Sequence, residues 1–135
     1  MSELIALKII TPERVLFEGD VEKFTVKSKG EVGDFQIMPG HLPMTATVGL
    51  GRVLLTLPGG EEKQATLFGG FALIEKDRAT ILTEVAEWPE EIDLERALRA
   101  KERAEENMRQ ENMDYARAQL ALYRAIERID IKELN

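Results

Sequence analysis

Few side chains of this chain are suited to catalysis. It has one histidine, His41, two serines, Ser2 and Ser28, and no cysteine. A Ser-His-Asp arrangement would have to combine His41 with one of these serines, and neither serine lies in a nucleophile motif. A single imidazole without thiolates also leaves a zinc ion short of ligands. These residue types therefore argue against a hydrolase or a metalloenzyme.

Arginine is the residue type whose spacing could bind an anion. Arg117, Arg124 and Arg128 are separated by seven and four residues, so on a helix they fall within roughly 40° of one another. Arg96 and Arg103 likewise share one face of the preceding segment. Two interpretations are open. Either these are solvated faces with local ion pairs, or a bound anion offsets the repulsion between Arg124 and Arg128 at i,i+4.

The arginines lie in a segment with strong helix composition. Residues 92–134 contain neither proline nor glycine and are rich in alanine, leucine, arginine and glutamate. Residues 110–114 are the best candidate for a break, with Asn112 or Asp114 able to cap a second helix. Seven alanines would let two helices approach closely: Ala97, Ala100, Ala104, Ala116, Ala118, Ala121 and Ala125.

The simplest prediction for this segment is an antiparallel helical hairpin with roughly 20 residues in each helix. The alternative is one continuous helix of about 40 residues, which would need a partner to cover its apolar stripe. The two forms can also represent different states of the same chain.

The first 87 residues have the pattern of short β-strands. Turn-forming residues, several of them Gly or Pro, separate the apolar runs, and no helical pattern alternates with them. Such spacing predicts a sandwich or a barrel. The predicted fold class is α+β, with an antiparallel β domain at residues 1–87 followed by the helical hairpin at residues 88–135. We expect strands at residues 4–10, 15–17, 21–26, 51–57, 63–68, 71–75 and 78–85.

Charge and hydropathy limit the partners. The net charge is −7 and the sequence pI is about 4.9, which argues against nucleic acid because phosphate neutralisation needs a basic patch. No apolar run approaches the ~20 residues of a membrane span, and the N-terminus lacks the pattern of a secretory signal. We therefore expect no direct membrane insertion, and any work at a membrane would depend on other proteins.

Three segments in register along the whole chain resemble the epsilon subunit of bacterial and chloroplast F-type ATP synthases. Residues 33–43 look like the family's G-[ED]-x-G-[IL]-x-PGH-x-P loop. Residues 68–71 and 79–82 are similar to its GGF and V-T-I-L strands, and Glu87 with residues 92–97 resembles the opening of its helical half. Gln36 stands where the loop glycine is usual, and Trp88-Pro89 replaces a charged or small pair.

The resemblance implies a ten-stranded β-sandwich followed by a two-helix domain. The implied function is that of a non-catalytic rotor subunit, which couples ion-driven rotation to ATP synthesis and inhibits ATP hydrolysis. Its implied partners are the gamma subunit and the c-ring for the sandwich, and the beta and alpha subunits for the regulatory hairpin. We expect it at the cytoplasmic face of the cell membrane rather than at a chloroplast thylakoid. No cofactor is required, and ATP is expected as a regulatory ligand.

The resemblance also assigns candidate roles to single residues. The basic face expected to meet the carboxylate-rich loop of the beta subunits consists of Arg117, Arg124 and Arg128. The c-ring candidates are Glu31, Asp34 and His41, of which Asp34 and His41 could equally serve as loop-structuring residues. Carboxylates of Glu105, Glu106 or Glu127 could satisfy the same arginines in place of a ligand. The candidate ATP-binding residues are Glu87, Ile92, Asp93, Arg96, Ala97, Arg103, Arg124 and Arg128.

Two functions of other classes remain open at this point. One is a free nucleotide-sensing module that binds ATP outside a rotary motor. The other is a structural adaptor in which a β-sandwich is joined to a coiled-coil hairpin. Co-purification separates these alternatives, because a rotor subunit should be recovered in a stoichiometric complex with alpha, beta and gamma chains.

Overall fold

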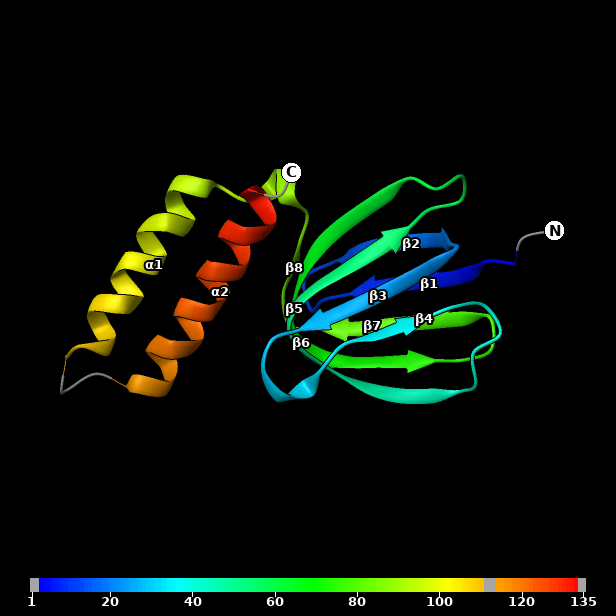
Figure 1. Cartoon of the computed structure of the whole chain (residues 1–135), viewed down its shortest axis with the longest axis horizontal. Helices are drawn as coiled ribbons and strands as arrows, with labels where there is room; N and C mark the ends of the chain where they lie inside the picture. Colours follow the sequence, from blue (N-terminus) through cyan, green and yellow to red (C-terminus); the bar gives the residue numbers. More distant parts are fainter. Residues whose placement is uncertain (1–2, 111–113, 134–135) are drawn as a thin grey trace. The chain divides into compact units, whose positions relative to one another are not determined.

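The chain folds into two compact units, Met1–Glu87 and Trp88–Asn135. The computed structural model describes residues 3–110 and 114–133 (Figure 1), with the side chain of Glu31 not described. The first unit is built of β-strands and the second of helices.

In the described part of the first unit, eight strands form one continuously paired sheet. The strand order is β2-β1-β7-β6-β5-β3-β4, and β8 pairs with β6. The elements are β1 (Ile5–Ile10), β2 (Val15–Val21), β3 (Lys23–Ser28), η1 (Gly30–Val32), β4 (Phe35–Ile37), β5 (Met44–Thr56), β6 (Glu62–Ile74), β7 (Arg78–Thr83) and β8 (Ala86–Glu87).

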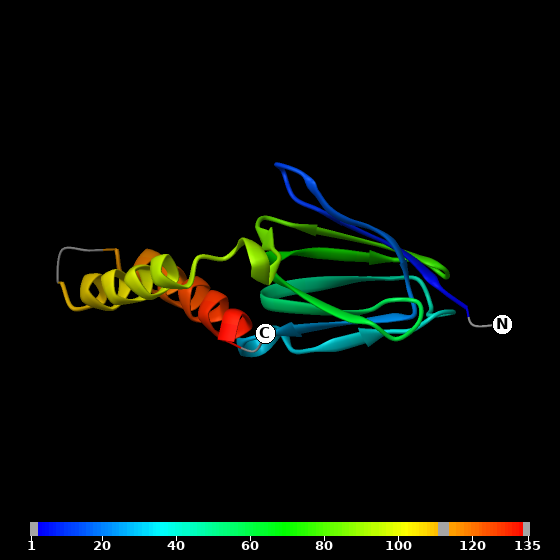
Figure 2. The same cartoon turned by 90° about the horizontal axis from the view of Figure 1, so that it is seen from above.

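This sheet becomes a two-layer sandwich because its two longest strands belong to both layers (Figure 2). The first half of β5 pairs with the second half of β6, which continues through β7 and β1 to β2. The second half of β5 pairs with β3 and with the first half of β6, which also carries β8. The described residues form eight strands where ten were expected, and counting each half of β5 and β6 separately gives ten strand segments.

Glycines allow β5 and β6 to cross between the layers. Gly70 has φ +124°, and a Cβ there would collide with the carbonyl oxygen of Leu82 on β7. A Cβ at Gly51 would collide with the carbonyl oxygen of Lys27 on β3. The neighbouring backbones therefore approach too closely for any side chain at these two positions.

The core of the first unit lies between the two layers. In β1, Ile5, Leu7 and Ile9 are buried, and in β3, Phe24 and Val26 are buried. Alternate residues of both strands point outward, as expected for sheets with one face packed and one face solvated. These inward-facing apolar side chains from both layers form the core of the sandwich.

Three details of the predicted strands are corrected by the structure. The β1–β7 pair is parallel, whereas an all-antiparallel domain was expected. Strand β4 and the first half of β5 were missed, because β4 has only three residues and residues 44–50 alternate weakly. Residues 63–68 and 71–75 were expected as two strands but belong mainly to β6, since Gly69 and Gly70 bend the strand without ending it.

The second unit contains η2 (Pro89–Glu91), α1 (Leu94–Met108) and α2 (Tyr115–Glu133). The two helices run antiparallel side by side (Figures 1 and 2), which confirms the predicted hairpin. The Asp93 carboxylate caps α1 by accepting the N–H of Arg96 at 3.2 Å, and Asp114 caps α2 by accepting the N–H of Arg117 at 3.2 Å. The other candidate cap, Asn112, lies outside the described residues.

Small side chains bring the two helices together. Ala97 and Ala104 of α1 are buried, as are Ala118 and Ala125 of α2. Their spacing of seven residues keeps each pair on one face of its helix. Ala116 and Ala121 were expected at the same contact but lie on the exposed surface of α2.

We predict that alanine at Gly51 or Gly70 lowers the free energy of unfolding by at least about 3 kcal/mol, because a Cβ would force two strands apart. Gly59→Ala is the matched control. Gly59 also has a positive φ, of +96°, but a Cβ there meets open space, so the cost should be about 1 kcal/mol. Urea denaturation followed by circular dichroism measures all three. Equal losses at Gly51 and Gly59 would contradict the close-approach explanation.

Candidate functional site

A shared offset from the helix contact places the candidate arginines on one side of the hairpin. Each arginine directly precedes a buried residue of its helix, and the seven-residue spacing of the buried alanines is that of a helix–helix contact. We infer from this that each arginine lies about 100° from the contact line in the same rotational sense. Because the helices are antiparallel, equal offsets place both sets on the same side. The pairs are Arg96–Ala97 and Arg103–Ala104 on α1, and Arg117–Ala118, Arg124–Ala125 and Arg128–Ile129 on α2.

Arginines of the two helices also lie at similar heights along the helix axes. Lys132 of α2 donates from Nζ to the carbonyl oxygen of Pro89 at 3.0 Å, so the last turn of α2 lies beside the start of α1. Arg128 lies one turn before Lys132 and therefore near the level of Arg96. Arg124 and Arg128 are half-buried, whereas Arg96 is exposed. The folded hairpin thus carries a one-sided cluster of guanidinium groups.

Three other ATP-site candidates have structural roles in the helical unit. Asp93 is the N-cap of α1, and its Oδ1 orients the first turn from which Arg96 projects. Ile92 and Ala97 are 6% and 5% exposed, respectively, so they pack rather than present polar groups. These residues determine where α1 begins and how it is rotated.

Glu87 lies at the end of β8 in the sandwich unit. Its N–H donates to Thr66 Oγ1 at 3.0 Å, and the Thr66 hydroxyl lies 3.4 Å from the Glu87 carboxylate. Thr66 is fully buried, so its hydroxyl holds Glu87 in position. Glu87 stays a predicted ATP contact.

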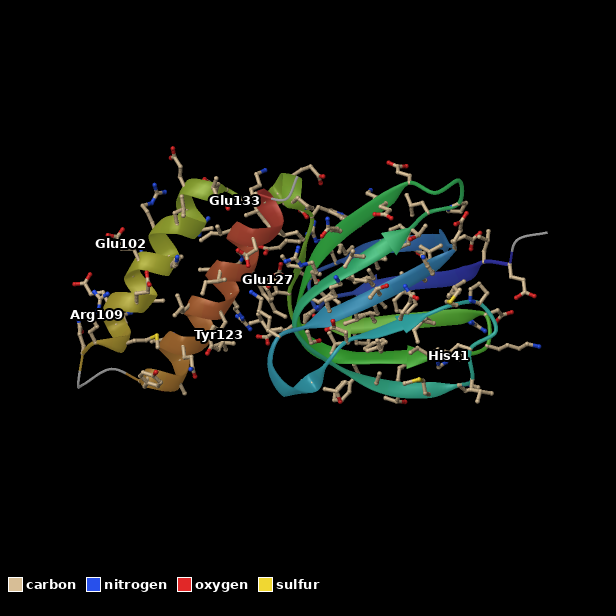
Figure 3. All side chains as sticks on the ribbon, in the orientation of Figure 1. His41, Glu102, Arg109, Tyr123, Glu127 and Glu133 are labelled. Atoms are coloured by element: carbon tan, nitrogen blue, oxygen red, sulfur yellow. The ribbon has the colours of Figure 1, made fainter. Side chains whose placement is uncertain are left out.

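The three c-ring candidates occupy two different loops of the sandwich. Glu31 in η1 and Asp34 precede β4, whereas His41 follows it, and His41 lies at the opposite end of the sandwich (Figures 1 and 3). Asp34 accepts the N–H of Ser28 at 3.0 Å. His41 Nδ1 lies 2.7 Å from the carbonyl oxygen of Leu42 and therefore donates to it. Both side chains thus shape their loops.

An exposed apolar patch on the sandwich was not identified from the sequence. It consists of Ile10, Phe71, Leu73 and Leu82 on the outer face of the layer that contains β1, β7 and β6. Phe71, Leu73 and Leu82 are 54%, 43% and 41% exposed, and Leu82 lies directly between Ile10 and Phe71 in the strand register. A signal existed, because residues 71–74 are apolar at every position instead of alternating with polar residues.

The described residues contain no group of three or more His, Cys, Asp or Glu side chains that could hold a metal ion. None of the helices in the described part of the chain is long and apolar enough to cross a membrane.

Comparison with known families gives two matches that together cover almost the whole chain. The model for the beta-sandwich domain of the ATP synthase delta/epsilon chain matches residues 4–89, and the model for its long alpha-helix domain matches residues 90–133. The ATP synthase epsilon chain of Caldanaerobacter subterraneus subsp. tengcongensis is 41% identical over 134 residues, covering 97% of this chain and 95% of that relative. The epsilon chain of Bacillus velezensis is 41% identical over 129 residues, covering 94% and 96%.

The fold is also similar to that of a chain in a solved assembly. A chain in the cryo-EM structure of the Euglena gracilis mitochondrial ATP synthase superposes with a TM-score of 0.83 at 21% identity, covering 98% of this chain and 82% of that one. At that identity the likeness concerns the fold alone, and the family follows from the sequence matches. On this evidence the chain belongs to the family of ATP synthase epsilon chains.

Proposed function

We propose that this chain is a non-catalytic central-stalk subunit of an F-type ATP synthase, which regulates ATP hydrolysis through its helical hairpin. It would work as a peripheral subunit at the cytoplasmic face of the cell membrane. The one-sided arginine cluster supports the proposed regulation of ATP hydrolysis. Each of its five arginines directly precedes a buried residue of α1 or α2. Such a cluster suits anionic partners, whether a phosphate ligand or an acidic protein surface.

The sandwich is the proposed docking unit for the gamma subunit. Its apolar patch is contiguous, lies on a rigid two-layer scaffold, and includes the half-exposed ring of Phe71. Exposed contiguous apolar surface typically marks a protein interface, and a large aromatic residue is a common anchor at such sites. The loop that contains Glu31 and Asp34 is the proposed contact with the c-ring.

We predict that residues 1–88 alone fold and bind gamma, and that Phe71→Glu weakens this binding by about 30-fold or more, because it exchanges roughly 2 kcal/mol of apolar burial for a charge. Thr25→Glu, on the outer face of the opposite layer, is the matched control and should bind normally. Surface plasmon resonance with immobilised gamma measures the dissociation constants. Undiminished binding by the folded Phe71→Glu variant would exclude the apolar patch as the gamma interface.

Four arginines of the cluster form the proposed ATP site in the folded hairpin: Arg96, Arg103, Arg124 and Arg128. Guanidinium groups converging from two helices repel one another, and a triphosphate offsets this repulsion through bidentate hydrogen bonds. Glu127 of α2, labelled in Figure 3, is fully buried and is one of the carboxylates that could satisfy these arginines in place of a ligand. A ligand that binds only the folded form stabilises it by about 2.7 kcal/mol at a hundred times Kd. ATP would therefore hold the hairpin in its folded, non-inhibitory form.

We predict saturable ATP binding by the isolated chain, with Arg96→Ala and Arg103→Ala each weakening it by about tenfold through the loss of charge-assisted hydrogen bonds. Arg109→Ala is the control of equal charge change. Arg109 is exposed and lies twelve residues beyond Ala97, about 120° from it in the opposite rotational sense to Arg96, and so on the other side of α1. Calorimetric titration decides the point, and absence of saturable binding at millimolar ATP would refute the site.

The role of Asp93 needs its own comparison, because Asp93→Ala also removes the α1 cap. Asp93→Ser keeps a capping oxygen. Equal ATP affinity in Asp93→Ser and the unmodified chain would assign Asp93 to helix capping alone.

Inhibition is proposed to use the α2 arginines when the hairpin is extended. Ion pairs at an exposed surface contribute about 0–1 kcal/mol each, so several must act together on the acidic loop of the beta subunits. Arg117 belongs to this face but not to the proposed ATP site. A substitution of Arg117 therefore tests inhibition without removing a residue of the proposed ATP site.

We predict that replacing Arg117, Arg124 and Arg128 with alanine raises ATP hydrolysis by the assembled complex several-fold, and that Arg117→Ala raises it without changing ATP affinity. The control removes three positive charges from α1 at Arg99, Lys101 and Arg109, and should leave hydrolysis unchanged. Steady-state ATPase assays on purified complexes provide the measurement. If the triple variant stays bound and hydrolysis does not rise, the basic face has no part in inhibition.

A further inference from the structure

The two ends of the helical unit meet at one backbone carbonyl. Lys132, in the last turn of α2, donates to the carbonyl oxygen of Pro89 at 3.0 Å. The same oxygen accepts the backbone N–H of Ile92 at 3.1 Å. Both lone pairs of this carbonyl are therefore used. The residues that lead into α1 are tied directly to the end of α2, 43 residues away.

The acceptor is held rigidly before Lys132 reaches it. Pro89 is buried and its ring restricts φ. The N–H of Trp88 donates to the Glu91 carboxylate at 2.9 Å, and the N–H of Glu91 donates back to the Trp88 carbonyl at 3.0 Å. An ordered acceptor loses little further entropy when the ammonium group binds. The Lys132–Pro89 bond therefore requires little additional ordering of its acceptor.

The Lys132–Pro89 bond connects the end of α2 to the residues just before α1, so it opposes separation of the two helices at this end of the hairpin. α1 ends at Met108 and α2 begins at Tyr115, whereas Lys132 lies in the last turn of α2, far along the helix from Tyr115. The contact along the helices includes the small side chains of Ala97, Ala104 and Ala125, and an alanine buries little apolar area.

We propose that Lys132 and the Pro89 carbonyl form a latch that sets how often the hairpin opens. This latch stands on the geometry of the helical unit alone, whereas its effect on ATP hydrolysis rests on the proposed inhibitory function. Opening breaks a charged hydrogen bond and releases η2 at the same time. Release of the α2 terminus therefore also frees η2, which leads from the sandwich into the hairpin.

Hydrogen exchange of the full chain, followed by NMR, tests the latch through the Ile92 amide. Lys132→Met should speed exchange at Ile92 and along α2 by about tenfold. Lys132→Arg keeps a donor and a charge and should retain most of the protection. Lys101→Met, which removes a lysine from the middle of α1, is the matched control and should exchange like the unmodified chain.

The Ile92 amide distinguishes a latch from a local effect of Lys132 on its own helix. Loss of a positive charge at a helix C-terminus frays the last turn, which would speed exchange near Lys132 only. Unchanged exchange at Ile92 in Lys132→Met would overturn the latch. In the assembled complex, Lys132→Met should lower ATP hydrolysis by favouring the extended form. If exchange at Ile92 accelerates while hydrolysis stays constant, the latch holds and the proposed inhibitory function fails.

Discussion

Close approach of strand backbones at Gly51 and Gly70 is the constraint on which the sandwich unit depends. At both positions a neighbouring carbonyl occupies the space that a Cβ would need. These contacts let β5 and β6 pass from one layer to the other while keeping their hydrogen-bonded partners. The same bends set the outward direction of Phe71 and Leu73, because a strand that changes layer keeps its alternation on each side of the bend. The apolar patch is thus a consequence of how the sheet folds over.

In the hairpin, one spacing determines two properties. The heptad spacing of the buried alanines fixes which faces of α1 and α2 meet, and each arginine that precedes such a residue inherits a fixed angle from that contact. Rotation of either helix by one residue would bury an arginine or move it to the other side. The positions of the buried small side chains therefore also determine which side of the hairpin is basic. The capping bonds of Asp93 and Asp114 fix where each helix begins.

The hairpin and the strand-rich first half were predictable because their signals are local. A long segment without Pro or Gly, alanine repeats and a capping Asp114 indicate two helices without knowledge of the tertiary structure. The parallel β1–β7 pairing and the three-residue strand β4 were not predictable, since both depend on contacts between distant residues. For the same reason Asp34 and His41 were grouped as one surface, although β4 separates their loops. The Lys132–Pro89 bond left no sequence signal, because its partners are 43 residues apart and one is a backbone carbonyl.

The two units differ in what holds them together, and this difference is suited to a regulated subunit. The sandwich buries large side chains such as Phe24, Leu55 and Ile81 almost completely, and each contributes about 1.5–3 kcal/mol. The helical unit buries Ile92, Ile129 and Ile131, but its other buried apolar helix residues are alanines, and a buried alanine contributes far less. A single charged hydrogen bond of about 1.5–3 kcal/mol, or a bound anion, therefore weighs more in the hairpin than it would in the sandwich. A helix contact made of leucines throughout would reduce that weight. The alanine positions thus make the state of the hairpin depend more on the few polar groups at its side and its base.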